Sequence, residues 1–210
     1  MTIAEMHNLC DLLIDKADAP WFNPTEKDKF LNLAQIEFVE TRYAQFEAIE
    51  KRRSELIPLV RQLNFVGVNL IDLNAVPDFL YVLSLNAYIY DDCVPGGVRI
   101  EPVHPIQLDD YAGSEQDPFN KTADDNVGYI QYNDGVGANT LDVKSTNIPQ
   151  SITLFYLKRP EDVNIIIPTD CELPVSTHEE IVNIAVRKMM MTIEDQNYQV
   201  QMNEIQQQGQ

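Results

Sequence analysis

Basic side chains are scarce in this sequence. Its 210 residues include 15 lysines and arginines against 33 aspartates and glutamates, which gives a formal net charge of -18 at pH 7. A chain with this balance is repelled by phosphate backbones and by anionic lipid surfaces. The composition therefore argues against an ordinary role in DNA binding.

Cysteine and long apolar runs are also lacking. The three cysteines, Cys10, Cys93 and Cys171, are odd in number, lie far apart and form no Cys-x-x-Cys pair. This spacing argues against a disulfide framework and a zinc knuckle, and it suits a reducing cytoplasm. No apolar segment approaches the ~20 residues of a membrane span, and no basic region precedes an apolar stretch at the start. We expect a soluble protein that is not exported and has no membrane partner.

Recognisable catalytic motifs are missing as well. The stretch 135–140 lacks the third glycine of a dinucleotide fingerprint, and no nucleophile elbow or Walker loop occurs. His7 lies in a short apolar segment and His104 stands between Pro102 and Pro105, so both histidines are expected to be structural. We therefore expect no enzymatic activity and no cofactor.

Three pairs of adjacent aspartates leave one alternative open. Paired carboxylates supply the hard oxygen ligands that Mg²⁺ and Ca²⁺ prefer. None of the pairs has the spacing of an ion-binding loop, so solvated turn residues are the favoured interpretation and we expect no metal site. A soluble carboxylate-metal enzyme stays as the alternative hypothesis for these pairs, which are Asp91 and Asp92, Asp109 and Asp110, and Asp124 and Asp125.

The N-terminal region is typical of helices. Asn23, Pro24 and Glu26 match an N-cap, a proline at the first helical position and a glutamate at the third. No glycine or proline follows until Pro58, which predicts a helix longer than the ~10 to 14 residues that are usual. Apolar residues at steps of three and four predict its buried face, namely Leu33, Ile36, Val39, Tyr43 and Phe46.

From residue 65 onward, short apolar segments alternate with turns. Aromatic and β-branched residues, bounded by Asn, Asp, Gly and Pro, are typical of strands. The predicted strands form a small antiparallel sheet and cover residues 79–90, 128–132, 139–144 and 151–158.

The segment after residue 172 offers a choice between a metal site and a helix start. Ser176 and Glu179 fit a capping box with His178 at the second helical position, whereas a zinc-protease pattern needs a second histidine where Val182 stands. The spacing favours the helix. Residues 198–210 are polar and glutamine-rich, and are interpreted as a frayed helix end or as an arm that orders on a partner.

These segments predict an α+β fold with a helical core, built from the N-terminal helices and a C-terminal helix, and an inserted small antiparallel β domain. We expect an N-terminal helical region over residues 1–64, a β-rich insertion over 65–172, a helix over 173–197 and an arm over 198–210. The insertion carries much of the charge, because the stretch from Asn86 to Asp142 holds eleven acidic residues against Arg99 and Lys121. An acidic surface of this kind keeps a protein soluble, which is one explanation. The other is that the surface faces a polyanion, such as DNA, that must pass without being bound.

The most distinctive stretches of the chain are 73–85 at the start of the insertion, 98–111 and 117–120 within it, 154–160, and the helix entry 173–181. Their order resembles that of head-tail connector (adaptor ring) proteins of tailed bacteriophages. The stretches inside the insertion look like those of neck ring proteins from crAss-like podoviruses of gut bacteria. The similarity covers most of the chain.

The resemblance implies a virion structural protein, made in the host cytoplasm, that forms a twelvefold ring in the phage neck. Such a ring joins the portal to the tail, contacts other neck or tail proteins and lets genomic DNA pass without specific binding. A tail-tube protein further from the portal is a second structural alternative. The interface residues that the resemblance implies are Phe38, Tyr43, Phe46, Asp109, Asp110, Tyr111, Phe119, Tyr198, Met202 and Ile205.

Overall fold

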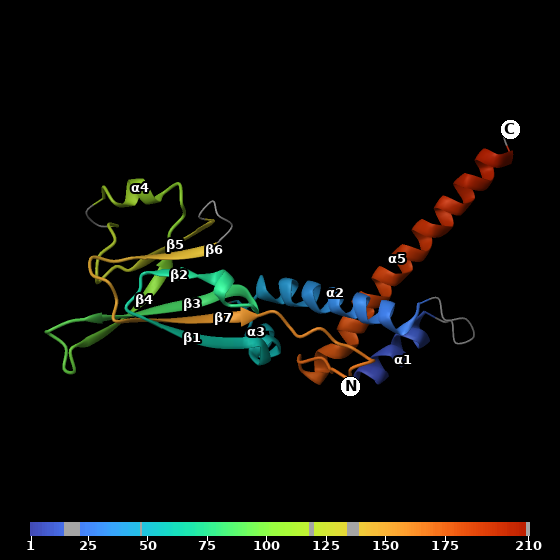
Figure 1. The fold of residues 1–210 in the computed structure, drawn as a ribbon, viewed down its shortest axis with the longest axis horizontal. Helices are drawn as coiled ribbons and strands as arrows, with labels where there is room; N and C mark the ends of the chain where they lie inside the picture. The colour runs from blue at the N-terminus through green and yellow to red at the C-terminus, as the bar shows by residue number, and fades with distance from the viewer. Residues whose placement is uncertain (15–21, 47, 118–119, 134–138, 209–210) are drawn as a thin grey trace. The chain divides into compact units, whose positions relative to one another are not determined.

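The computed structural model describes residues 1–14, 22–46, 48–117, 120–133 and 139–208, the last sixteen of them by their backbone alone (Figure 1). The chain divides into two compact units. One is a helical unit that comprises Met1–Leu59 and Pro160–Gln210, and the other is a β unit that comprises Val60–Arg159. The fold is α+β, as the sequence predicts.

The helical unit combines both ends of the chain. Its helices α1, α2 and α5 contact one another, and α3 packs on α2. A single 3-10 turn, η1, follows α3. The elements are α1 (Ile3–Leu13), α2 (Pro24–Tyr43), α3 (Glu50–Leu56), η1 (Ile57–Leu59) and α5 (Val175–Gln208).

Helix α2 begins as predicted and is longer than usual, as predicted. The Asn23 side chain accepts a hydrogen bond from the Glu26 amide, and the Glu26 carboxylate accepts one from the Asn23 amide, both at 2.9 Å. The helix has 20 residues and ends at Tyr43, where a turn leads into α3. The Arg42 guanidinium binds the Glu55 carboxylate at 2.8 Å and so holds α3 against α2, which is a tertiary contact that helix periodicity does not reveal.

The buried face of α2 differs in part from the predicted one. Val39 is fully buried as predicted, but Leu33 is 56% exposed, and Phe38, which lies outside the predicted face, is 1% exposed. Several polar residues of α2 are buried, and hydrophobic periodicity does not find them because it counts only apolar positions. The buried residues of α2 include Lys27, Asp28, Leu31, Ala34, Gln35, Phe38, Val39 and Arg42.

The start of α5 differs from the predicted capping box, in which Ser176 was the N-cap. The helix begins at Val175, so Ser176 lies inside it and His178 is at the fourth position. Its first turn is closed by Thr177, whose amide and hydroxyl both donate to the Pro174 carbonyl, and by His178, whose Nε2 donates to the Leu173 carbonyl at 2.8 Å. A helix does start here, and its backbone continues through most of the predicted arm to Gln208.

The β unit holds one sheet with the strand order β1-β7-β3-β4-β5-β6-β2. The predicted strands are present with nearly the predicted bounds. The sheet is mixed, however, because β4 and β5 pair in parallel over two residues, and the connection between them carries the short helix α4 (Tyr111–Ser114). The strands are β1 (Val60–Val66), β2 (Leu70–Asp72), β3 (Phe79–Tyr90), β4 (Val98–Pro105), β5 (Gly128–Asn133), β6 (Asn139–Lys144) and β7 (Ser151–Lys158).

This sheet curls upon itself. Strands β1 and β2 stand at opposite ends of the strand order, yet only residues 67–69 join them, a link that reaches roughly 15 Å at most. Gly67 has a φ of 66°, its amide donates to the Gln150 carbonyl, and the Val143 amide donates to the Asn69 carbonyl. The curled sheet encloses an apolar core that includes Ile71, Leu73, Leu85, Ile89, Leu141, Val143, Ile152 and Leu154.

Replacing Phe38 tests the core of the helical unit. We expect Phe38→Ala to lower the free energy of unfolding by about 3–5 kcal/mol, because it leaves a cavity in a buried position. Urea denaturation followed by circular dichroism measures the change. The control is Leu33→Ala on the same helix, which should cost less than about 1 kcal/mol because Leu33 is largely exposed. A Phe38→Ala cost as small as that of the control would contradict the described packing.

Candidate interaction surfaces

Two of the three predicted aspartate pairs have a member that is engaged in local structure. Asp91 forms an ion pair with Arg99 at 3.2 Å, and Asp124 accepts hydrogen bonds from the Asn147 amide and side chain at 2.9 and 2.6 Å. Within the described ranges, no three His, Cys, Asp or Glu side chains lie close enough together to hold a metal ion. Nor does any helix in the described part of the chain have the length and apolarity to cross a membrane.

A short loop in the helical unit presents apolar side chains. We call residues 164–169 the Ile loop. Asn164 and Thr169 exchange backbone hydrogen bonds of 3.2 and 3.0 Å across its base, and the Asn164 side chain accepts from the Ile166 and Ile167 amides. The turn is therefore closed from within, while Ile166 and Ile167 remain 73% and 72% exposed.

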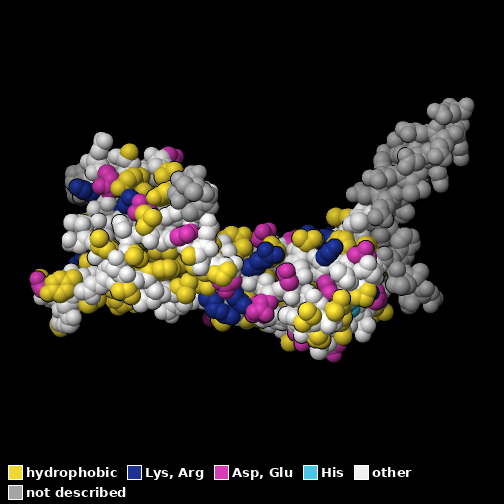
Figure 2. All heavy atoms as spheres, in the orientation of Figure 1, with side chains coloured by type: hydrophobic (Ala, Val, Ile, Leu, Met, Phe, Trp, Pro, Cys, Tyr) yellow, Lys and Arg dark blue, Asp and Glu magenta, His cyan; other side chains and the backbone are white. Residues whose placement is uncertain are grey.

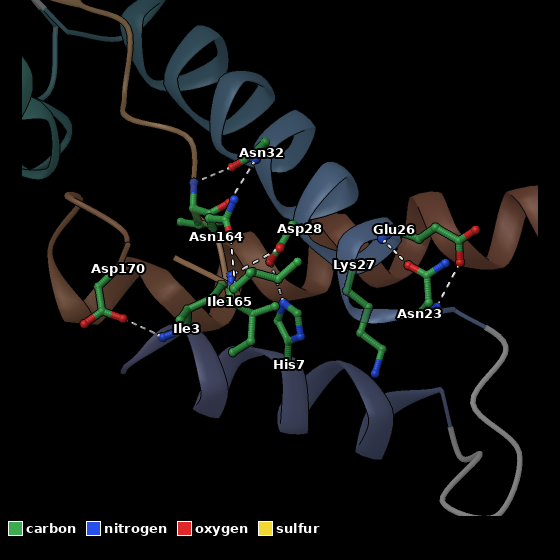
Figure 3. A network of polar contacts seen from close by, with 12 residues as sticks. Ile3, His7, Asn23, Glu26, Lys27, Asp28, Asn32, Asn164, Ile165 and Asp170 are labelled. Carbon is green, nitrogen blue, oxygen red and sulfur yellow. Dashed lines mark hydrogen bonds and ion pairs between the residues drawn. The ribbon is translucent and has the colours of Figure 1, made fainter. Parts of the chain in front are cut away.

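A buried carboxylate fastens the Ile loop to two helices (Figure 3). Asp28 on α2 accepts hydrogen bonds from the Ile165 amide at 3.2 Å and from His7 Nε2 on α1 at 2.8 Å. Asp28 and His7 are each only 6% exposed. Because an ionised carboxylate only accepts hydrogen bonds, His7 carries its proton on Nε2.

Further polar contacts hold the segment on either side of the loop. The Asn32 side chain both accepts from the Val163 amide, at 2.7 Å, and donates to the Val163 carbonyl, at 3.2 Å. On the other side, the Asp170 carboxylate accepts from the Ile3 amide at 2.7 Å (Figure 3). The exposed isoleucines thus stand on a base that is bonded to both α1 and α2.

A second apolar surface lies beside α2. It is a hollow of about 320 Å³, which we call the aromatic hollow, lined by Phe22, Glu26, Lys29, Phe30, Leu33 and Thr192. The rings of Phe22 and Phe30 meet edge to face with their centroids 5.3 Å apart, an arrangement that aromatic pairs prefer. Figure 2 shows further hydrophobic side chains on the visible surface of each unit.

A charged cluster joins α2 to its neighbours. Arg42 is buried, lies 4.6 Å above the Phe38 ring and binds the carboxylates of Glu55 and Glu180 at 2.8 and 2.5 Å. Glu37 pairs with Arg187 and Lys188 of α5, and the hydrogen bond from Lys188 is the main cause that lowers the pKa of Glu37. The carboxylate of Glu37 therefore supports the unit above its ordinary pKa and loses that effect as the pH falls.

The predicted interface residues of the N-terminal region lie in or near the core of the helical unit. Phe38 is buried between helices. Tyr43 ends α2 and is partly buried, and Phe46 in the following turn lies 5.6 Å below the Arg53 guanidinium. Their predicted contact with a neighbouring subunit stays a prediction.

The remaining predicted residues lie elsewhere in the chain. Asp109 and Asp110 are exposed in the turn before α4, and Lys144 Nζ lies 5.4 Å from the ring of Tyr111. Phe119 lies outside the described residues. Three others lie on α5 where only the backbone is described, namely Tyr198, Met202 and Ile205.

Two of the three cysteines are buried and one is exposed. Burial raises the pKa of the Cys10 thiol to about 12 and that of Cys171 to about 11, so both are protonated at neutral pH. Cys93 is exposed in the β unit. Thiol chemistry on the folded protein is therefore expected at Cys93 alone among the three.

Sequence reasoning missed the Ile loop and its anchors. A signal was present in the run of three isoleucines between Asn164 and Pro168, because a short apolar run beside turn residues is either a strand or a presented loop. The pairing of His7 with Asp28 had no local signal, since the two residues lie 21 positions apart.

Removing the Asp28 carboxylate tests the anchor of the Ile loop. We expect Asp28→Ala to cost about 1–3 kcal/mol of unfolding free energy, because the buried His7 ring and the Ile165 amide lose their acceptor. Urea denaturation measures this cost, and limited proteolysis should cut faster near residues 163–170. The control, Glu37→Ala, removes partly exposed ion pairs of the same helix and should cost less than about 1 kcal/mol. Equal costs would argue against the anchoring role of Asp28.

No family model matches the chain, and none of the curated proteins compared with it is a significant match.

Proposed function

We propose that this chain is a structural subunit of a tailed-phage virion that assembles as a ring in the neck. The ring would join the portal to the tail and extend the conduit for genomic DNA. The proposal assigns the chain no catalytic residue, cofactor or metal, and its partners are further copies of itself, the portal and other neck or tail proteins.

The order of elements supports this proposal. The resemblance to connector proteins rests on a helical region that is interrupted by a β-rich insertion and resumed by a closing helix. The chain has the same order, with a helical unit formed by both ends and a β unit inserted at Val60–Arg159.

The observation that carries the proposal is the braced Ile loop. Ile166 and Ile167 stay more than two-thirds exposed, and their amides donate to the Asn164 side chain. The chain just before them is fastened to α2, because Asp28 accepts from the Ile165 amide and Asn32 accepts from the Val163 amide. Rigid, exposed apolar side chains are typical of surfaces that another protein covers. A subunit of an assembly can bury such side chains against its neighbour.

The charge of the chain also suits a DNA conduit. Lys and Arg facing DNA bind phosphates and release counterions, which would slow the passage of a genome. In the β unit, Arg99 instead forms ion pairs with Asp91, at 3.2 Å, and with Glu101, at 2.8 Å. With 33 acidic residues in the chain, a surface facing the lumen would repel DNA rather than retain it.

Light scattering and negative-stain images of the full chain, with and without its candidate portal, test the proposed function. We expect the protein to form closed rings, either by itself or on the portal, because the exposed isoleucines of the Ile loop are covered only in an assembly. A protein that stays monomeric at high concentration and ignores the portal would contradict the proposal.

Shortening the C-terminus tests the role of the predicted arm. Removing residues 198–210 should leave the thermal unfolding midpoint nearly unchanged but weaken assembly, because this segment has few apolar residues to contribute to a core. Circular dichroism and light scattering measure the two effects. Removing only residues 206–210, which are four glutamines and a glycine, is the matched control and should affect neither. Loss of soluble protein on the longer truncation would instead place the segment in the core.

A further inference from the structure

We propose that the Ile loop of one copy docks into the aromatic hollow of the next copy. This inference rests on the proposed function, because it describes how neighbouring subunits of the ring meet. Both surfaces belong to the helical unit, so the contact is defined by that unit alone.

The two surfaces lie on different faces of α2. Asp28 and Asn32, four residues apart, hold the Ile loop segment on one face of the helix. Phe30 and Leu33, three residues apart, line the hollow on another face. Residues two apart on a helix, such as Asp28 and Phe30, do not point in the same direction. One copy therefore presents its loop on one face of α2 and its hollow on another.

This placement determines the symmetry of the contact. A twofold dimer needs one patch that matches itself, whereas a contact between two different patches joins copies head to tail. Head-to-tail contacts form a closed ring when the rotation between copies closes, and a filament when it does not. A loop and a hollow on different faces of one helix therefore suit a head-to-tail contact, as in the proposed ring, and do not suit a twofold dimer.

The chemistry of the two surfaces is complementary. Ile166 and Ile167 offer branched aliphatic side chains, and Phe22, Phe30 and Leu33 offer an apolar lining. Burial of these groups against one another removes apolar area from water on both copies.

Charge at the edges supports the same pairing. Asp162 and Asp170 are exposed beside the Ile loop, whereas the lining of the hollow holds both Lys29 and Glu26, whose charges cancel. A loop flanked by aspartates is therefore repelled by a second such loop but not by the hollow.

The loop is also prepared for docking. Its backbone is held by the Asn164 side chain and by Asp28 before any partner arrives. A segment that is already ordered loses less conformational entropy on binding than a free one. The bracing of the Ile loop is thus explained by a contact that must form repeatedly around a ring.

Cysteine crosslinking tests the contact on the full chain. In a Cys93→Ser background, which removes the exposed native thiol, Ile167→Cys and Leu33→Cys are made singly and together. Under oxidising conditions at concentrations where multimers form, or on the portal, the double variant should give a ladder of covalent multimers. A mixture of the two single variants should stop at dimers, and either single variant by itself should give no crosslink.

Polar replacement gives a second readout with a matched control. The variant Ile166→Ser with Ile167→Ser should weaken self-association by at least about tenfold, because both aliphatic side chains are lost from the contact. Ile148→Ser changes an isoleucine of the β unit that is 66% exposed, and it should leave assembly unchanged. Circular dichroism should show both variants folded like the unaltered protein, since each replaced side chain is exposed.

The outcomes separate this contact from the ring itself. Rings that form without a ladder, and that survive the Ile166→Ser with Ile167→Ser change, would overturn the contact and leave the proposed function standing. A crosslink in the single Ile167→Cys variant would overturn the head-to-tail arrangement. The absence of both rings and crosslinks would refute the contact and the proposed function together.

Discussion

The buried carboxylate of Asp28 is the contact on which the helical unit depends. It accepts one hydrogen bond from His7 on α1 and one from the backbone of the segment that returns from the β unit. Three segments of the chain that are far apart in sequence are thereby held at one point. A buried carboxylate without partners is costly, so the three segments stabilise one another or fail together. The same anchor holds the backbone directly before the exposed Ile166 and Ile167.

The β unit depends on a different constraint. Its first and last strands in the sheet order are consecutive in the chain, and a link of three residues forces the sheet to curl. Because the sheet curls, strands on both sides of the β4 to β5 pairing contribute side chains to one apolar core.

The sequence located much of the fold but little of the candidate site. Strands β3, β6 and β7 and the start of α2 agree with their predicted positions because alternation and capping act over a few residues. The Ile loop and the aromatic hollow were missed, because the solvent exposure of their apolar side chains depends on how distant segments pack. Exposure of Leu33, which looked like a core position, depends on which face of α2 the other helices cover.

By itself, the sequence determined the α+β class, the acidic balance and the elements whose boundaries carry local signals. The tertiary structure decided how α3 packs on α2, through Arg42 and Glu55, and which face of α2 is buried. It also decided that β4 and β5 run in parallel. Local signals arise from neighbours within one or two turns, whereas these features arise from side chains that meet only after the chain has folded.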